Sequence, residues 1–325
     1  MRILISAACV LSASAIAQMG SPGGGETQAL ALHPTDPNIL YAGGAKGFCK
    51  TTKGGKDNWP ATGLESYSPR AIVLDPNNPD VIYAGTYEMG VHNSVDGGAS
   101  WRAVNDGLVW KEVRALVVSP RDGNILYAAT DGGGVFKTTD GARTWHESNH
   151  GLIDKTVRAL VIDPRNPDTV YAGTWHGVYK TTDGGRNWSA DPQGLYDVDV
   201  VAMAMDPSDS RVIYAATQPR GVFRSADGGV TWRPGEKVLA ENLQSIAIDP
   251  ANPSHVYVGT RAGVFRSMDG GRTFQPAGLR WSNSAWTLVF DAKTSHSTLF
   301  YGGVGGVLKS TNGGKWWDVT GPIRP

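Results

Sequence analysis

An eight-residue turn sequence recurs through most of the chain and constrains the fold more than any other feature. Its clearest copy spans Thr181–Trp188 and reads Thr-Thr-Asp-Gly-Gly-Arg-Asn-Trp. Successive copies lie 42 to 44 residues apart, with third residues at Lys53, Asp96, Asp140, Asp183, Asp227, Asp269 and Asn312. A period in the forties with strand-like sequence between turns is typical of a β-propeller, in which each repeat forms one four-stranded blade. The sequence therefore predicts an all-β, seven-bladed propeller with antiparallel blades.

The chemistry of this turn indicates a structural role. A short carboxylate in a tight turn accepts hydrogen bonds from nearby backbone N–H groups, and the glycines after it supply positive φ angles. The closing tryptophan begins the next strand and offers a large apolar surface to a neighbouring blade. A catalytic or metal site needs convergent groups, whereas these residues lie one per blade around a ring. We therefore interpret as structural the residues Asp96, Asp140, Asp183, Asp227, Asp269 and Asn312.

These turns resemble the Asp-box, or BNR, repeat of sialidases, sortilin-type receptors, xyloglucanases and photosystem II assembly factors. The resemblance covers residues 28–320. It implies that the boxes are structural and face away from the ligand. Because those families share no single activity, the resemblance predicts the fold and not a reaction.

Two of these families allow a closer comparison. Sialidases hold a carboxylate with three arginines, but this chain has no match to their Arg-Ile-Pro motif. The opening Gly23–Gly25 and the segment 29–42 resemble the start of a xyloglucanase propeller, in which a catalytic aspartate follows the second strand. The corresponding position here is Ala45, while Asp131 reproduces the local pattern in a later blade.

The N-terminus has the pattern of a secretory signal peptide. A basic start at Arg2 precedes the apolar run Ile3–Leu11, and Ala15-Ile16-Ala17 supplies small residues before a cut. This pattern predicts a signal peptide over residues 1–17, cleaved before Gln18, and a secreted or periplasmic protein. Residues 18–325 show no linker or change in composition, so we expect a single propeller domain.

Composition excludes several classes of function. The 30 basic and 30 acidic residues balance, so no broad affinity for nucleic acid or anionic membrane is expected. No other apolar run is long enough to span a bilayer. The seven histidines show no ligand-like spacing, so we expect neither a metal site nor a cofactor. We expect the protein to be a monomer.

The turns of a four-stranded blade alternate between the two faces of the ring. The boxes share one face, the box face, with the Asp-Pro-x-Asn-Pro turns. The loops between second and third strands and the loops between blades form the other, here called the variable face. Its loops differ from blade to blade, so they can encode specificity. The inner strands begin at this face with Gln28, Arg70, Arg114, Arg158, Val201, Gln244 and Trp286.

Arginines and tryptophans on the variable face are the candidate ligand-binding residues. Three successive blades place a guanidinium at the channel mouth, which could hold a carboxylate, sulfate or phosphate. Tryptophans nearby offer flat surfaces to sugar rings. Alternatively, the arginines form salt bridges with Glu88, Asp131, Glu112 and Asp154, and the aromatic rings pack under loops. The candidates are Arg70, Arg114, Arg158, Trp110, Trp175, Trp286, Arg220 and Arg261.

These observations favour a binding or assembly module over an enzyme. Its ligand would be an anionic glycan or an acidic segment of an envelope protein on the variable face. The alternative is a sialidase-like or xyloglucanase-like glycoside hydrolase, or a polysaccharide lyase, that uses Asp131 and Glu88, since hydrolysis needs two carboxylates about 5–10 Å apart. The variable loops are only a few residues long, whereas catalytic pockets usually have longer walls. A third possibility is a structural part of a larger secreted assembly.

Overall fold

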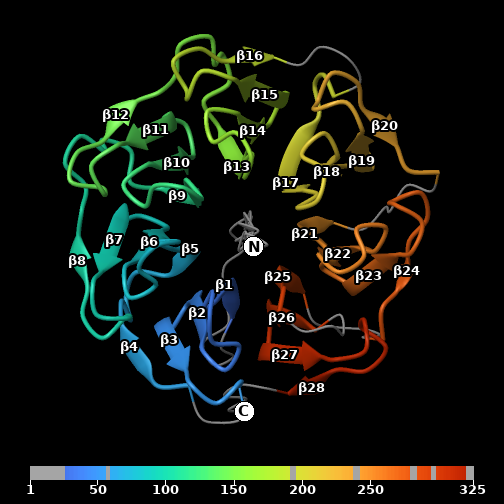
Figure 1. Cartoon of the computed structure of the whole chain (residues 1–325), viewed down its shortest axis with the longest axis horizontal. Coiled ribbons are helices and arrows are strands. Elements are labelled where there is room, and N and C mark those ends of the chain that lie inside the picture. Colours follow the sequence, from blue (N-terminus) through green and yellow to red (C-terminus); the bar gives the residue numbers. More distant parts are fainter. Residues whose placement is uncertain are drawn as a thin grey trace, which may run out of the picture.

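The computed structural model is a ring of seven four-stranded antiparallel sheets (Figure 1). It describes residues 26–55, 59–190, 195–236, 242–278, 284–293 and 298–319. Within each sheet the strands follow sequence order from the centre of the ring to its rim. The predicted seven-bladed all-β propeller is confirmed, while the predicted signal peptide lies outside the described residues.

Each blade repeats the same four strands. The inner strands are β1 (Thr27–Leu32), β5 (Pro69–Leu74), β9 (Val113–Val118), β13 (Val157–Ile162), β17 (Asp199–Met205), β21 (Leu243–Ile248) and β25 (Ala285–Phe290). The second strands are β2 (Leu40–Gly44), β6 (Ile82–Thr86), β10 (Leu126–Thr130), β14 (Val170–Thr174), β18 (Ile213–Gln218), β22 (Val256–Thr260) and β26 (Leu299–Gly303).

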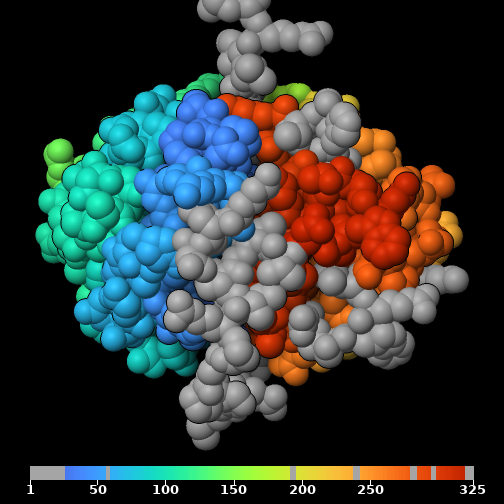
Figure 2. Space-filling view, turned by 90° about the horizontal axis from the view of Figure 1, so that it is seen from below, coloured from blue at the N-terminus to red at the C-terminus, as the bar shows by residue number. Residues whose placement is uncertain are grey.

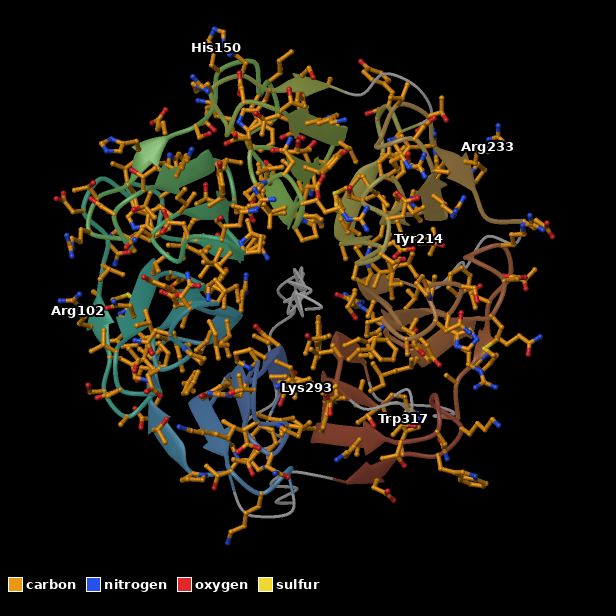
Figure 3. All side chains as sticks on the ribbon, in the orientation of Figure 1. Arg102, His150, Tyr214, Arg233, Lys293 and Trp317 are labelled. Carbon is orange, nitrogen blue, oxygen red and sulfur yellow. The ribbon has the colours of Figure 1, made fainter. Side chains whose placement is uncertain are left out.

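The outer half of each blade is shorter and more polar. The third strands are β3 (Gly47–Thr51), β7 (Val91–Ser94), β11 (Gly134–Thr138), β15 (Gly177–Thr181), β19 (Gly221–Ser225), β23 (Gly263–Ser267) and β27 (Gly306–Ser310). The rim strands are β4 (Ala61–Gly63), β8 (Arg102–Ala103), β12 (His146–Glu147), β16 (Ser189–Ala190), β20 (Arg233–Pro234), β24 (Gln275–Pro276) and β28 (Asp318–Val319). Figure 3 shows Arg102, His150 and Arg233 at this outer rim.

Hydrogen bonds within the Asp-box fix the turn between the third and fourth strands. In blade 4 the Asp183 carboxylate accepts hydrogen bonds from the Thr181 hydroxyl at 2.8 Å and from the Asn187 backbone N–H at 2.9 Å. Gly184 and Gly185 follow with φ angles of 73° and 84°. Hydrogen bonds from the Asn187 side chain and backbone, and then from the Thr181 hydroxyl, lower the pKa of Asp183. The carboxylate is therefore engaged inside its own turn.

Tryptophans at the ends of the boxes pack between blades. Trp188 is buried, and its indole N–H donates a hydrogen bond to the Ser148 carbonyl of the preceding blade at 2.8 Å. Trp145 makes the equivalent bond to the Val104 carbonyl at 2.9 Å. Trp317 bonds in the same way to the Ala277 carbonyl at 2.8 Å. These three rings combine apolar packing with a specific bond to the preceding blade, which holds the blade edges in register.

Cations of the third strands hold four of the boxes from the neighbouring blade, and a tyrosine joins the cation at two of them. In blade 4 the Lys180 ammonium and the Tyr171 hydroxyl each donate to the Gly228 carbonyl in the box of blade 5, both at 2.8 Å. The bond between a third-strand cation and the next box recurs at Lys50 to Gly97, Lys137 to Gly184 and Arg266 to Gly313. Successive blades are thus joined by specific bonds as well as by apolar contact.

In the described part of the ring, blade 1 packs against blade 7. Among the described residues, β1 to β4 form blade 1 and β25 to β28 form blade 7, with no strand shared between the two sheets. Inner strand β1 contacts β25 and β26, and Leu30 shares an apolar cluster with Leu288 and Phe300. Figure 2 shows the blue first blade beside the red last blade. Apolar packing therefore joins the first and last blades.

Candidate functional site

A ring of β-bulges marks the start of the seven inner strands. In blade 3, Val113 pairs with Thr130 and Ala115 pairs with Ala129, which leaves Arg114 as the extra residue. A bulge changes the direction of the side chain that it carries. Equivalent register shifts occur in all seven blades and define the bulge ring, Gln28, Arg70, Arg114, Arg158, Val201, Gln244 and Trp286. These residues are all buried, and they are the seven channel positions expected from the sequence.

Blades 2 to 4 place arginines in this ring, and carboxylates lie between them. The Glu112 carboxylate lies 3.4 Å from the Arg70 guanidinium and 2.7 Å from that of Arg114. Arg114 also binds Asp131. We call Arg70, Arg114 and Arg158 the arginine arc; Arg158 pairs with Asp199 at 3.0 Å.

The pairing agrees in part with the salt-bridge alternative stated from the sequence. Glu112 and Asp131 bind arginines, as that alternative expects. Asp154 instead accepts a hydrogen bond from the His176 backbone N–H at 3.0 Å, and its carboxylate lies 2.9 Å from His176 Nδ1. Glu88 is exposed and forms no ion pair with a described residue. Asp199 is the acidic partner that the sequence interpretation did not assign to an arginine.

Burial disfavours the charged forms of Arg70 and Arg158 in the arginine arc and of the carboxylates beside them. It lowers the pKa of Arg70 to about 10, with a further decrease from Arg114, although Glu112 acts in the opposite direction. Burial also lowers the pKa of Arg158 and raises that of Asp199 to about 6 despite their mutual attraction. The pKa of Glu112 is raised for the same reason. The removal of these groups from water thus outweighs the attraction between them.

Two arginines of the arc also face aromatic rings. The Arg70 guanidinium carbon lies 3.8 Å from the centre of the Tyr87 ring, and that of Arg158 lies 5.1 Å from the Trp175 ring. Trp175 remains 49% exposed. Its outer surface is therefore accessible to a ligand while its ring lies beside a buried cation.

Exposed apolar side chains gather on the same part of the variable face. They come from the loops between second and third strands and from the loops between blades, over blades 2 to 5. Trp110 belongs to this group and packs against the β10–β11 loop, where a Cβ at Gly133 would lie 2.3 Å from the indole. We call the group the apolar arc; it comprises Met89, Val109, Trp110, Ile153, Trp175 and Tyr196.

The other half of the bulge ring is uncharged. Blades 6, 7 and 1 contribute Gln244, Trp286 and Gln28, which we call the amide arc. Trp286 is only 8% exposed, so it does not offer the open stacking surface expected from the sequence. Val201 of blade 5 separates the amide arc from Arg158 on one side of the ring.

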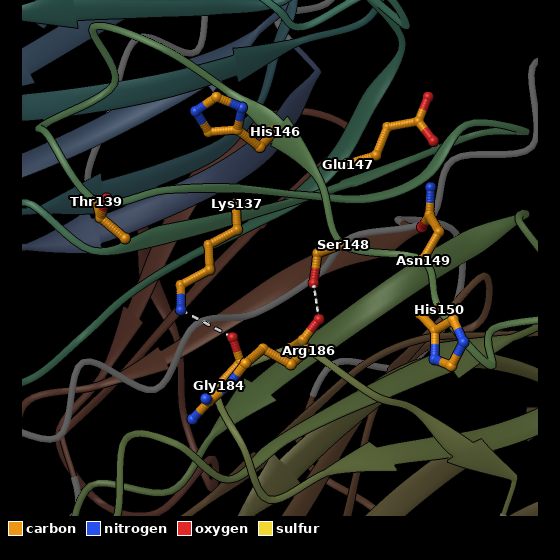
Figure 4. A pocket seen from close by; sticks show the side chains of 10 residues that line it. Lys137, Thr139, His146, Glu147, Ser148, Asn149, His150, Gly184 and Arg186 are labelled. Atoms are coloured by element: carbon orange, nitrogen blue, oxygen red, sulfur yellow. Dashed lines mark hydrogen bonds between the residues drawn. The ribbon is translucent and has the colours of Figure 1, made fainter.

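A pocket of about 230 Å³ lies away from the bulge ring, between blades 3 and 4. Its lining includes His150, which lies at the outer rim. Figure 4 shows Lys137 donating to the Gly184 carbonyl at 2.8 Å and Ser148 donating to the Gly185 carbonyl at 2.6 Å. The lysine bond is the one that joins other pairs of blades, so we interpret this pocket as part of blade packing.

One protein-family model matches the middle of the chain. Residues 90–221 match the family model described as Sortilin, neurotensin receptor 3. This match agrees with the box geometry and with the seven four-stranded blades. The chain is an Asp-box β-propeller.

Solved structures share this propeller at low sequence identity. The GH74 xyloglucanase from Xanthomonas campestris superposes with a TM-score of 0.73 at 17% identity, over 94% of this chain and 54% of its own. YCF48 bound to D1 peptide gives 0.66 at 16% identity, over 93% and 99%. The extracellular domain of a protein described as a one-component system from B. thetaiotaomicron gives 0.67 at 14%, over 93% and 40%.

These likenesses concern the fold. The propeller spans about half of the length of the GH74 structures that it matches, 46% to 54%. No curated protein sequence matches the chain. In the described part of the propeller, no helix is long and apolar enough to cross a membrane. Among the same residues no group of three or more His, Cys, Asp or Glu side chains is arranged to hold a metal ion.

The remaining sequence candidates lie on the variable face of the propeller but do not form one cluster. Arg220 is exposed on the β18–β19 loop, and Arg261 is partly buried on the β22–β23 loop. Asp131 binds Arg114, whereas Glu88 is exposed on the β6–β7 loop and makes no hydrogen bond or ion pair with a described residue. The two carboxylates named for the hydrolase alternative are therefore in different environments.

Proposed function

We propose that this propeller is an exported binding or assembly module that holds an acidic polypeptide segment on its variable face. The observation that carries this proposal is the apolar arc, six large exposed apolar side chains on the face where buried arginines pair with partly exposed carboxylates. Exposed apolar groups gathered on one face usually mark an interaction site. Aromatic residues, Met and Arg are enriched at protein interfaces.

Two features favour a polypeptide over a glycan. Met89, Val109 and Ile153 present aliphatic side chains, which suit apolar side chains of a protein better than hydroxylated sugar rings. Ligand carboxylates can replace Asp199 or Glu112 on the arginines, because burial already raises the pKa of both groups. The likeness to YCF48, a structure described as bound to D1 peptide, supports the view that this architecture accepts a peptide.

A display screen tests the proposal. The full chain would be panned against random twelve-residue peptides and, in parallel, against an array of neutral, uronic-acid and sialylated glycans. We expect enrichment of peptides that combine Asp or Glu with aromatic or aliphatic residues. Trp175→Ala should weaken binding, whereas Trp316→Ala, which removes a 78% exposed tryptophan of the box face, should not.

Other outcomes of the screen would contradict the proposal. Binding to glycans alone would assign the face to carbohydrate. Equal losses for Trp175→Ala and Trp316→Ala would show that the measured binding does not use the variable face. Export is part of the same proposal, and the N-terminal sequence of the secreted protein would begin at Gln18 if the predicted cleavage occurs.

One observation favours glycoside hydrolysis as a second candidate. A carboxyl group with a raised pKa is what a general acid requires, and burial raises the pKa of Asp199 to about 6. Asp199 pairs with Arg158, which lies beside the exposed ring of Trp175. Release of sugar from any glycan bound in the array, abolished by Asp199→Asn with binding retained, would establish this activity.

A further inference from the structure

The amide arc contains buried polar groups that blade packing does not use. Gln244 is 1% exposed, and neither its side-chain oxygen nor its nitrogen has a hydrogen-bond partner among the described residues. The Trp286 indole N–H and the Gln28 side-chain oxygen also lack partners there. Buried polar groups in proteins are nearly always hydrogen-bonded, so each unpaired one needs an explanation.

The geometry of the blades does not require polar residues at these positions. Blade 5 has Val201 in the bulge ring, so an apolar side chain is compatible with this backbone. The next residue of each inner strand is alanine in blades 1 to 5, but blades 6 and 7 carry Ser245 and Thr287. Both hydroxyls are buried without a partner among the described residues. The uncharged members of this unpaired set in the inner strands therefore lie on one side of the ring, on β21, β25 and β1, whereas the unpaired atoms of Arg70, Arg158 and Asp199 on the other side belong to charged groups.

The chemistry of these side chains fits a peptide group. A glutamine amide offers one acceptor and two donors in one plane, and an indole N–H is a donor only. A main-chain amide presents the complementary carbonyl and N–H. We propose that the amide arc binds the main chain of the polypeptide segment, while the arginine arc on blades 2 to 4 binds its acidic side chains. This inference rests on the proposed function and deepens it.

Gln244→Leu tests the inference, and Gln218→Leu is its matched control. The Gln218 side chain donates a hydrogen bond to the Leu243 carbonyl at 2.9 Å, so its amide supports the fold. We expect Gln218→Leu to lower the melting temperature of the free protein. Gln244→Leu should leave it unchanged or raise it, because an unsatisfied buried amide is removed. A clear decrease for Gln244→Leu would show a structural amide and overturn the inference.

Binding is measured with the most enriched peptide of the display screen. Gln244→Leu should weaken its binding about tenfold, the effect of losing one or two hydrogen bonds. N-methylation of successive peptide bonds in this probe should weaken its binding to the parent protein. One peptide bond of the probe is expected to contact Gln244 in the parent protein. N-methylation of that bond should weaken binding to the parent but should have little further effect on binding to Gln244→Leu.

The outcomes separate this inference from the proposed function. A peptide that binds Gln244→Leu as tightly as the parent, but binds Trp175→Ala weakly, would overturn the amide arc and leave the proposed function intact. A screen that enriches no peptide would overturn both. Glycan binding that depends on Gln244 would assign the arc to sugar hydroxyls and overturn the assignment to a peptide main chain.

Discussion

Replacement of Asp199 by asparagine should stabilise the propeller at alkaline pH. The Asp199 side chain is 24% exposed and lies 3.0 Å from Arg158, whose side chain is 8% exposed. One of its carboxylate oxygens has no hydrogen-bond partner among the described residues. Burial raises the pKa of this carboxyl, and the attraction of Arg158 only partly opposes that change. A neutral side chain of the same shape would avoid the cost of burying the charge.

The pKa gives the size and the pH range of the effect. A change from an ordinary 3.8 to about 6 corresponds to about 3 kcal/mol of unfolding free energy. Between these pH values the folded protein binds the proton more tightly than the unfolded chain does. Stability from this group is therefore complete below pH 4 and is lost as the pH rises through 6. Asp199→Asn should exceed the parent by up to about 3 kcal/mol at pH 8 and match it near pH 4.

Urea unfolding at pH 4 and pH 8, followed by tryptophan fluorescence, measures this difference. Asp209→Asn is the matched control, because Asp209 is paired with Arg211 at 2.8 Å on the surface and its pKa is lowered to about 2. Its titration lies outside the pH 4 to 8 range, so its effect should be the same at both values. A parent protein that is more stable than Asp199→Asn at pH 8 would refute the reasoning. The Arg158–Asp199 pair would then be a net source of stability.

Three further predictions concern the scaffold. In the box of blade 4, Asp183→Ala should lower the melting temperature more than Asp183→Asn, because Asn312 already accepts backbone hydrogen bonds at 3.0 Å in blade 7; equal effects would argue against the hydrogen bonds as the cause. Trp188→Phe should lower the unfolding free energy by about 1–3 kcal/mol, since the Ser148 carbonyl loses its buried donor; an unchanged urea midpoint would contradict this. A circular permutant opened at Gly151, between blades 3 and 4, should keep its circular dichroism spectrum and cooperative melting, whereas unfolding would show that chain order matters beyond the packing of blades 1 and 7.

The candidate site could be predicted from the sequence only in part. All seven residues of the bulge ring were identified as channel positions, because each occupies the same place in a repeat whose strands are easily aligned. Their partners were less predictable. Arg158 pairs with Asp199 of the next blade, while Asp154 contacts His176. The unpaired amide of Gln244 was not predicted, because nothing in the repeat indicates which polar atoms lack partners.

The sequence by itself determined the number of blades, the order of their strands and the positions of the boxes. Those features depend on local chemistry, such as a carboxylate that accepts hydrogen bonds from its own turn and glycines with positive φ, and this chemistry is repeated in every blade. Only the tertiary structure decided which arginines are neutralised, which apolar side chains remain exposed and which amides are unpaired. These properties depend on contacts between neighbouring blades, where side chains about 40 residues apart in the sequence meet.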